Sequence, residues 1–456
     1  MSDNHNHSNS PIPDDAQSKD LDAKALTTTM LAILDQNNQG DYTSPAKLYP
    51  HQWLWDSAFT AIGLRHIDPE RAAREIASLV RGQWSNGMIP NMIFNPSNQY
   101  RLDRDFWSSW LSPFAPDHLA TSGITQPPML ADAVVKVGEK LPKSHRTEFY
   151  RFMFEPLVQY HQWLYLERDP HNEGLTLQIH PWEVGLDNTP PWVHQLYDHS
   201  RPWWIALIEK LGLQGFINFI RRDRSVPPGQ RISSLEALML WDVVKRLRRK
   251  NYNIERIMHR TLFATQDISF NSIMVRNNTQ LQTIANIIRK KLPSELLTQM
   301  KHSEQALDKL YDDISQQYYS RDFITHKLIK EPSIGTFLPL YAGTISKERA
   351  SKLVKLLKDH KKYWLHHPVP SVPLDSSFFD ADRYWQGPSW VNTNWLIIDG
   401  LERYNYTELA DELRQKTIQL VNNQGAWEYF DPLNGRGLGA ESFSWTAALT
   451  IDLLNQ

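Results

Sequence analysis

Apolar residues recur at spacings of three and four through most of this chain, which is the period of an α-helix that buries one face. Stretches in which apolar and polar residues alternate, as in a half-buried β-strand, are almost absent. The sequence therefore predicts an all-α protein. The expected helices span residues 21–35, 56–67, 69–84, 128–140, 146–167, 201–221, 233–251, 270–290, 293–318, 346–358, 390–404, 406–422 and 442–454.

Two of the expected helices carry recognisable start signals. Asp68 precedes Pro69, so the Asp side chain can cap a helix whose first residue is the proline. Thr344 and Ser346 lie at the start of the helix expected at 346–358, and either of them could be its cap. These signals place helix starts near residues 69 and 346.

The distribution of the helices indicates how the chain is divided. Residues 1–20 are polar, acidic and proline-bearing, which is typical of a disordered tail. No Gly/Ser-rich linker interrupts residues 21–456, so we expect them to form a single domain. About a dozen helices in one domain favour an (α/α)6 barrel, or toroid. In that fold six antiparallel helix pairs close into a ring, the inner helices bury both faces, and irregular loops form the mouth.

Charge and cysteine content exclude several classes of function. The chain has 49 Lys and Arg against 51 Asp and Glu, so no bulk positive field attracts nucleic acid or an anionic membrane. It has no cysteine, which excludes disulfides, thiolate metal sites and cysteine nucleophiles. No signal peptide or run of about 18 apolar residues is present, and we expect a cytoplasmic protein. Its oligomeric state is left open, a homo-oligomer included.

Tryptophan is abundant, with 17 in 456 residues. Surplus indole rings either fill a large helical core or stack on the faces of sugars. Many of these tryptophans lie between the expected helices and close to carboxylates, as sugar recognition requires, because hydroxyl groups need charged acceptors. The stretches in question are 48–56, 83–91, 123–128, 180–188, 383–390 and 425–431.

Glycoside hydrolysis needs two carboxyl groups beside the bond that is cleaved. Asp187 follows Gly185 in a loop rich in Trp and Pro, a setting that can desolvate a carboxyl and raise its pKa as a general acid requires. On spacing alone Asp187 and Glu428 could equally be structural, the first capping a turn before Thr189 and the second pairing with an Arg. The candidate carboxylates are Asp56, Glu183, Asp187, Glu428 and Asp431.

The motifs in these loops resemble those of glycoside hydrolase family 63, and within it those of bacterial hydrolases of glucosylglycerate and mannosylglycerate. The resemblance runs from about Tyr49 to Leu454, and more distantly the chain is similar to trehalases. The motifs, in family order, are HQWLWDSAF at 51–59, SGITQPP at 122–128, WEVGLDN at 182–188, PVPSVP at 368–373, YWQGPSW at 384–390, EYFDP at 428–432 and SWTAA at 444–448.

This resemblance implies an inverting glycosidase in which Asp187 is the general acid and Glu428 the general base. It implies a sugar subsite lined by Trp55, Asp56, Gln126, Trp182, Gly185, Tyr384, Trp385 and Trp390. Tyr49 and Arg221 match groups that hold the carboxylate of the aglycone. Gln386 departs from the Arg of many broader-family members, so their substrates do not transfer directly.

The expected substrate is therefore a small α-glycoside, with glucosylglycerate ahead of mannosylglycerate and both ahead of kojibiose-like or trehalose-like sugars. No HExxH, phosphate-binding loop or dinucleotide-binding motif is present, and we expect no metal and no cofactor. Two other classes of function are considered. A catalytically silent sugar-binding toroid would lack turnover, and a helical interaction scaffold would leave the loop tryptophans and carboxylates unexplained.

Overall fold

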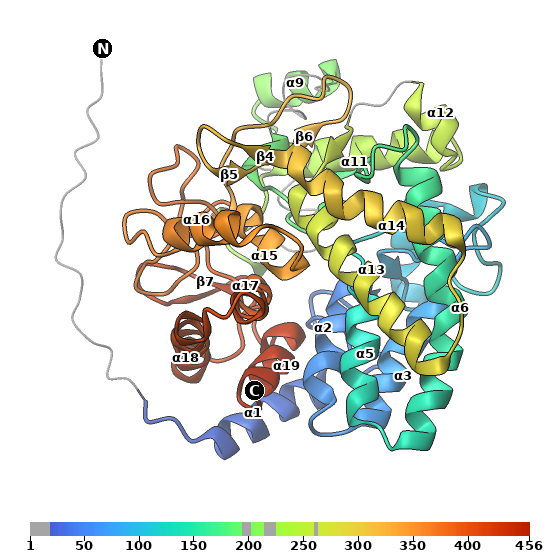
Figure 1. The fold of residues 1–456 in the computed structure, drawn as a ribbon. Coiled ribbons are helices and arrows are strands. Elements are labelled where there is room, and N and C mark those ends of the chain that lie inside the picture. Colours follow the sequence, from blue (N-terminus) through green and yellow to red (C-terminus); the bar gives the residue numbers. More distant parts are fainter. Residues whose placement is uncertain (1–18, 194–201, 214–224, 260–262) are drawn as a thin grey trace, which may run out of the picture.

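The computed structural model describes residues 19–193, 202–213, 225–259 and 263–456 (Figure 1). Within them, six helices form a closed inner ring in which each packs against the next and the last packs against the first. This arrangement confirms the predicted (α/α)6 barrel. The inner helices, in ring order, are α2 (Leu54–Leu64), α5 (Leu130–Lys140), α13 (Ile268–Ile288), α15 (Leu338–Ala342), α17 (Val391–Arg403) and α19 (Ser444–Leu453).

A second set of helices alternates with the first along the chain and lies outside it (Figure 1). Helix α3 packs on α2 and α5, α6 on α5 and α13, and α18 on α17 and α19. These outer helices are α1 (Ala23–Gln36), α3 (Pro69–Val80), α6 (Lys143–Arg168), α14 (Ser294–Ala306), α16 (Lys347–Leu357) and α18 (Thr407–Gln424).

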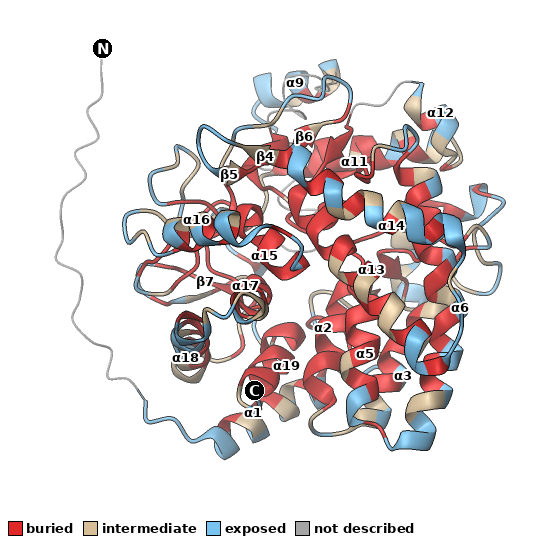
Figure 2. Cartoon of the chain, viewed as in Figure 1, coloured by how far each residue is buried: buried red, intermediate tan, exposed pale blue. Residues whose placement is uncertain are grey.

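The two sets differ in how they distribute apolar residues. Every residue of α2, α15 and α19 is buried, so these helices have no solvent face. Helix α1 instead buries Leu26, Met30 and Leu34, which share one face at a spacing of four. Figure 2 shows α2 and α19 buried throughout, whereas α6 and α18 turn an exposed side outward.

Most of the expected helices are confirmed to within a few residues, as are the caps. The Asp68 side chain accepts a hydrogen bond from the Arg71 N–H, and Ser346, not Thr344, caps α16. A helix is expected at 201–221. The structure has α9 (Trp203–Lys210) in this stretch, and residues 214–221 lie outside the described residues.

Two expectations were wrong. The helix expected at 293–318 ends with a 3-10 turn at Leu307–Leu310, and the remainder forms an antiparallel hairpin of β4 (Tyr311–Asp312) and β5 (Gln317–Tyr318). The inner helix α15 was missed, because it is short, begins with a proline in its first turn and is apolar on all sides. It therefore has none of the periodicity that marks an amphipathic helix.

The remaining elements lie in the segments that connect the inner and outer helices. Of the described helices, none has the length and apolar character needed to span a bilayer. The connecting segments contain α11 (Ser234–Arg249), which has 16 residues, and the short helices α4 (Arg101–Trp107), α7 (Pro181–Val184) and α12 (Ile254–Met258). The other strand pairs are antiparallel and join β1 (Gln52–Trp53) to β2 (Met92–Ile93), β3 (Thr265–Gln266) to β6 (Arg321–Asp322), and β7 (Tyr429–Phe430) to β8 (Gly437–Leu438).

The N-terminal and C-terminal parts of the chain pack together where the inner ring closes. Helix α1 packs on α19. The Asn37 side-chain amide donates to the Ser442 carbonyl at 2.8 Å and to the Ser444 hydroxyl at 3.0 Å. Asn37 and Ser444 are buried, so these hydrogen bonds are shielded from water.

A buried carboxylate links the C-terminal ends of two inner helices to the N-terminal half of a third. Asp452, in the last turn of α19, accepts hydrogen bonds from Arg65 at 2.9 Å and from the Trp395 indole at 2.8 Å, and the His66 ring nitrogen lies 2.7 Å away. Arg65 is the C-cap of α2, and Trp395 belongs to α17.

A second set of buried charges continues this network around the ring. Asp132 of α5 forms an ion pair with Arg276 of α13 at 3.4 Å. Lys136 of α5 pairs with Asp399 of α17 at 3.3 Å, and Asp399 also pairs with Arg403 at 2.6 Å. Burying these charges is tolerated because each has a partner of opposite sign.

We expect Asp452→Asn to lower the free energy of unfolding at neutral pH by about 3–5 kcal/mol, since it leaves Arg65 buried without its carboxylate. Urea denaturation measures this. Asp41 and Arg81 form an exposed ion pair, and Asp41→Asn should change stability by less than about 1 kcal/mol. Equal effects of the two variants would contradict the role of Asp452.

The pKa of Asp452 predicts that the stability of the fold depends on pH in the acid range. Burial alone would raise the pKa of Asp452, but the hydrogen bond with His66 and the charges of Arg65 and Lys136 outweigh it and lower the pKa to about 2. A carboxyl whose pKa falls on folding stabilises the fold at pH above its unfolded value, and this contribution is lost as the pH falls toward 2. Denaturation curves between pH 5 and pH 2 should therefore converge for the wild type and Asp452→Asn.

Candidate active site

The N-terminal ends of the inner helices enclose a small cavity of about 80 Å³. Asp56 lies in the first turn of α2 and Trp445 in the first turn of α19, while Gln126 and Trp385 precede α5 and α17. We call it the inner cavity. Its lining residues are Pro45, Tyr49, Trp53, Trp55, Asp56, Gln126, Gly185, Asp187, Tyr384, Trp385, Glu428, Phe443 and Trp445.

A larger cavity of about 480 Å³ adjoins the first, and we call it the outer cavity. Helices α4, α7 and α11 contribute Phe106, Trp182 and Trp241 to its wall. Arg231 also lines it and is 7% exposed. Five residues line both cavities and so mark the junction between them: Tyr49, Trp53, Asp187, Tyr384 and Glu428.

A glycine sets the path of the loop that carries Asp187. Gly185 ends helix α7 in the left-handed conformation, with φ of +80°, which residues with a side chain rarely adopt. A Cβ atom at this position would lie 2.8 Å from the Trp55 indole. Gly185 therefore allows both the turn and the close approach of the loop to Trp55.

Asp187 has the properties of a carboxyl group that stays protonated at neutral pH. It is partly accessible through the cavities, yet the surrounding protein removes enough water that burial raises its pKa to about 8. The Glu428 charge adds to the rise, and a hydrogen bond with the Tyr384 hydroxyl opposes it. A protonated carboxyl can donate a proton, as a general acid must.

Glu428 faces the same junction from the segment that precedes β7. One of its oxygens accepts a hydrogen bond from the Ala440 N–H at 3.0 Å. The other accepts from the hydroxyls of Tyr384 at 3.3 Å and Tyr49 at 3.4 Å. An ionised carboxylate is a pure acceptor, so these three donors suit a group that serves as a base.

A third carboxyl, that of Asp56, lies deeper in the inner cavity. Burial raises its pKa well above the ordinary value; a backbone hydrogen bond opposes this, and the charges of Glu428 and Asp187 add to it. Because a protonated carboxyl donates as well as accepts, Asp56 is suited to binding a hydroxyl group.

The aromatic residues are arranged in two layers. Trp385 lines the inner cavity and stacks on Trp390, with the ring centroids 3.7 Å apart and the planes 2° from parallel. Trp390 in turn stacks on Tyr429 at 4.5 Å, and its indole N–H donates to the Tyr384 carbonyl. Trp390 therefore lies behind the cavity wall and supports Trp385.

The structure brings together most of the residues that the sequence singled out. Trp182 lines the outer cavity, whereas the resemblance assigned it to the sugar subsite. Arg221 lies outside the described residues. The residues found in the inner cavity are Tyr49, Trp55, Asp56, Gln126, Gly185, Asp187, Tyr384, Trp385 and Glu428.

Two of the candidate carboxylates, Glu183 and Asp431, line neither the inner nor the outer cavity and hydrogen-bond to other parts of the fold. Glu183 is buried against Arg168, whose guanidinium donates to it at 2.9 Å, and it also accepts from the Ile179 N–H. Asp431 accepts from the Leu433 N–H at 2.8 Å in a turn. Spacing alone could not separate them from Asp187 and Glu428, because their local sequences are equally rich in aromatic residues.

Several lining residues were not predicted individually. Trp53 and Trp445 lie within motifs already noted, at 51–59 and 444–448, so the signal for them was present. Arg231 carries no such signal, because it follows a proline-rich loop at the start of α11 and only the fold directs it to the outer cavity.

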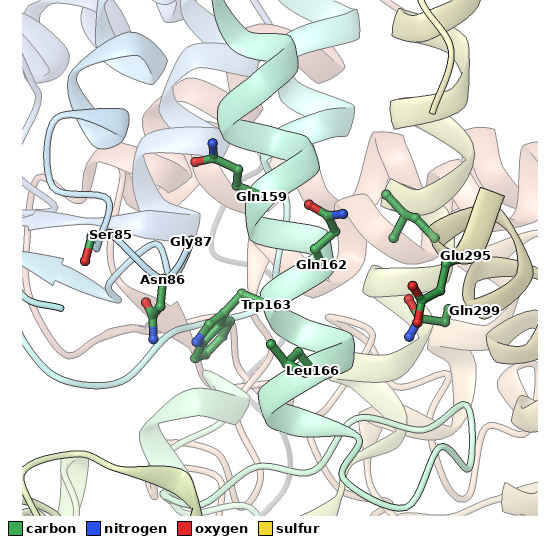
Figure 3. A pocket seen from close by; sticks show the side chains of 10 residues that line it. Ser85, Asn86, Gly87, Gln159, Gln162, Trp163, Leu166, Glu295 and Gln299 are labelled. Atoms are coloured by element: carbon green, nitrogen blue, oxygen red, sulfur yellow. The ribbon is translucent and has the colours of Figure 1, made fainter. Parts of the chain in front are cut away.

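A third cavity, of about 420 Å³, lies on the outer side of the ring between the 85–87 loop, α6 and α14 (Figure 3). The sequence stretch 83–91 contributes Asn86 to it, beside Trp163 of α6. Most of its polar groups are amides, and Glu295 is the one carboxylate among its lining residues. It therefore lacks the pair of carboxyl groups found at the junction.

One cluster in the described residues has metal-ligand character. His171, Glu173 and His326 place one ligand atom each within 4.8 Å of one another. Glu173 already pairs with Arg321 at 2.8 Å and accepts from Gln266 at 2.8 Å. Because the carboxylate is engaged by a cation, we assign no metal to this cluster.

Comparison with known proteins identifies the family. A family model described as the mannosylglycerate hydrolase MGH1-like glycoside hydrolase domain matches residues 49–446. The chain is 36% identical to the mannosylglycerate hydrolase of Thermus thermophilus, over 92% of this chain and 98% of that one. It is 31% identical to the glucosylglycerate hydrolase of Mycolicibacterium hassiacum, over 94% and 99%.

A crystal structure supports the same assignment. A GH63 mannosylglycerate hydrolase from Thermus thermophilus, in complex with Tris and D-glycerate, superimposes with a TM-score of 0.83 at 35% sequence identity. The match covers 94% of this chain and 99% of that one. The chain therefore belongs to the mannosylglycerate hydrolase MGH1-like glycoside hydrolases of family GH63.

Proposed function

We propose that this enzyme is an inverting glycosidase that cleaves an α-glycoside of glycerate, with mannosylglycerate ahead of glucosylglycerate as substrate. The observation that carries the proposal is the position of Asp187 and Glu428 where the inner and outer cavities meet. A glycosidic bond between a sugar in the inner cavity and an aglycone in the outer cavity would cross this junction.

The inner cavity has the composition of a sugar subsite. Trp55 and Trp385 offer indole surfaces for the C–H face of a pyranose, and Asp56 and Gln126 offer hydrogen-bonding groups for its hydroxyls. Among the part of its lining that the structure describes, there is no Lys or Arg. The subsite is therefore suited to a neutral sugar.

The outer cavity supports an anionic aglycone. Arg231 is the one Arg or Lys among the described residues that line it. A guanidinium matches the planar carboxylate of glycerate, and the Tyr49 hydroxyl lies at the same junction. D-Glycerate is bound by the Thermus relative, which agrees with this assignment.

In the proposed mechanism, protonated Asp187 donates its proton to the glycosidic oxygen, and the glycerate hydroxyl leaves. Glu428 takes a proton from a water molecule, and that water attacks the anomeric carbon from the face opposite the leaving group. The product sugar therefore has the inverted anomeric configuration. The Tyr384 hydroxyl, which bonds to both carboxyl groups, holds them in their relative positions.

The choice between mannose and glucose depends on how the inner cavity contacts O2, which is axial in mannose and equatorial in glucose. From the sequence alone, glucosylglycerate is expected ahead of mannosylglycerate. The higher identity to a mannosylglycerate hydrolase favours the other order. Kojibiose-like and trehalose-like substrates lack the carboxylate that Arg231 would recognise.

A hydrolysis screen tests the proposal, with mannosylglycerate, glucosylglycerate, kojibiose and trehalose as substrates. NMR should show the β-anomer as the first product of the preferred α-glycoside. Binding of these sugars without turnover would instead indicate the catalytically silent toroid, and initial release of the α-anomer would contradict the inverting mechanism.

Asp187→Asn should lower kcat by a factor of about 100 or more and leave KM within about threefold, because an amide keeps the shape but cannot donate the proton. Steady-state kinetics on the preferred glycerate glycoside measures both constants. Asp431→Asn alters another buried carboxyl outside the cavity walls and is the matched control, with kcat near that of the wild type. Unchanged turnover in Asp187→Asn would remove Asp187 from the acid role.

The raised pKa of Asp187 predicts the alkaline side of the pH profile. Since the acid works only when protonated, kcat/KM should hold below pH 8 and decline as the pH rises through about 8. The residual activity of Asp187→Asn should lack this decline. An alkaline limb that persists unchanged in the variant would have to come from another group.

Arg231→Gln should raise KM for the glycerate glycoside roughly thirtyfold, equivalent to about 2 kcal/mol, and raise KM much less for the matching glycoside of uncharged glycerol. Only the first substrate loses an ionic partner. Both substrates are measured at the same pH and salt concentration, and Arg221→Gln is measured in parallel. Equal losses on the two substrates would show that Arg231 does not recognise the carboxylate.

A further inference from the structure

The loop that carries Asp187 is held from the opposite side of the cavity by a segment about 200 residues away in sequence. The backbone N–H of Trp385 donates to the Asn188 side-chain oxygen at 2.8 Å. The Gln386 side-chain amide donates to the Asn188 backbone carbonyl at 2.7 Å. Asn188 and Gln386 are 0% and 1% exposed, so water does not compete for these hydrogen bonds.

The segment that supplies these donors is itself fixed. Tyr384 has a φ of +46°, in the left-handed region. The Gly387 N–H donates to the Ser371 hydroxyl at 2.9 Å, and a Cβ atom on Gly387 would lie 2.0 Å from the Asp380 carbonyl oxygen. Together with the stacking of Trp385 on Trp390, these contacts make the segment a rigid support.

The other hydrogen bonds described beside Asn188 lie within its own loop. Two residues before Asp187, Gly185 leaves α7 in the left-handed conformation, and the Thr189 N–H bonds back to Leu186 within the same loop. Those interactions are local to the loop, whereas the two bonds to Asn188 connect it to the wall that carries Tyr384 and Trp385.

We propose that Gln386 and Asn188 are positioning residues that hold the carboxyl group of Asp187 at the cavity junction for proton transfer. The proposal rests on the proposed role of Asp187 as general acid. Neither side chain lines the cavities, so both act through the Asp187 loop and not on the substrate.

Gln386 makes this hydrogen bond without carrying a charge. An Arg or Lys could also donate to the Asn188 carbonyl, but it would place a positive charge beside the Asp187 loop. A nearby cation stabilises an ionised carboxylate and would oppose the protonated form that a general acid needs. A Met would keep the length of the side chain and remove the donor.

The test compares Gln386→Met with Ser389→Ala. Ser389 lies in the same segment, is buried, and its hydroxyl donates to the His367 carbonyl at 2.7 Å, away from the Asp187 loop. We expect Gln386→Met to lower kcat about 10- to 100-fold with KM within about threefold, because a shift of the acid by about 1 Å has effects of this size. Ser389→Ala should keep kcat near that of the wild type.

A second readout separates positioning from general damage. The α-glycosyl fluoride of the preferred sugar releases fluoride, which leaves without protonation by an acid. On this substrate the loss of kcat in Gln386→Met should shrink to less than about threefold, as it should in Asp187→Asn. A deformed sugar subsite would impair both substrates alike and would overturn the proposal.

Folding is followed by thermal denaturation, and Gln386→Asn, whose amide is one methylene too short to reach the carbonyl, replaces Gln386→Met if the latter is unstable. If Asp187→Asn loses activity and both Gln386 variants behave like Ser389→Ala, the positioning role is wrong and the acid assignment stands. If Asp187→Asn retains full activity, the proposed function itself fails.

Discussion

Closure of the inner ring imposes the constraint on which the rest of the structure depends: an inward-facing side chain loses most of its contact with water. Charged groups in that position need partners of opposite sign or change their protonation state. The inner helices meet this constraint in two ways. Ion pairs and hydrogen bonds neutralise some carboxylates within the ring. Beside the cavities, burial instead raises the pKa of Asp56 and Asp187.

In the middle and C-terminal turns of these helices, the carboxylates are neutralised. Arg65 and Trp395 bond to Asp452, and Asp399 pairs with Lys136 and Arg403, so charge is balanced across four helices. At the N-terminal ends, the described residues that line the inner cavity include no cation. Three carboxyl groups, those of Asp56, Asp187 and Glu428, share that space, and the pKa values of the first two rise as a result. The same burial that would destabilise an unpaired charge prepares a general acid.

The loops place these carboxyl groups, and the loops are held in position because they pack closely against neighbouring side chains. Gly185 lets the Asp187 loop pack against Trp55, and the layered rings of Trp385, Trp390 and Tyr429 stiffen the facing wall. The two cavities that meet at the junction are suited to different parts of the substrate. The inner cavity is suited to the sugar, and the outer cavity, with Arg231, to an anionic leaving group.

The sequence by itself determined the helical class, the ring and most helix boundaries, because amphipathic periodicity and caps such as Asp68 are local properties. The resemblance carried by its motifs also singled out nine of the residues that line the inner cavity. Helix α15 escaped prediction because it is apolar on all sides, and the hairpin of Tyr311–Asp312 and Gln317–Tyr318 had no pattern to separate it from the preceding helix. Only the tertiary structure showed that Glu183 pairs with Arg168, placed Trp390 behind Trp385 and directed Arg231 to the outer cavity. Those outcomes depend on how side chains pack in three dimensions, which local spacing does not encode. The outer cavity, for example, is lined by residues from Leu48 to Glu428.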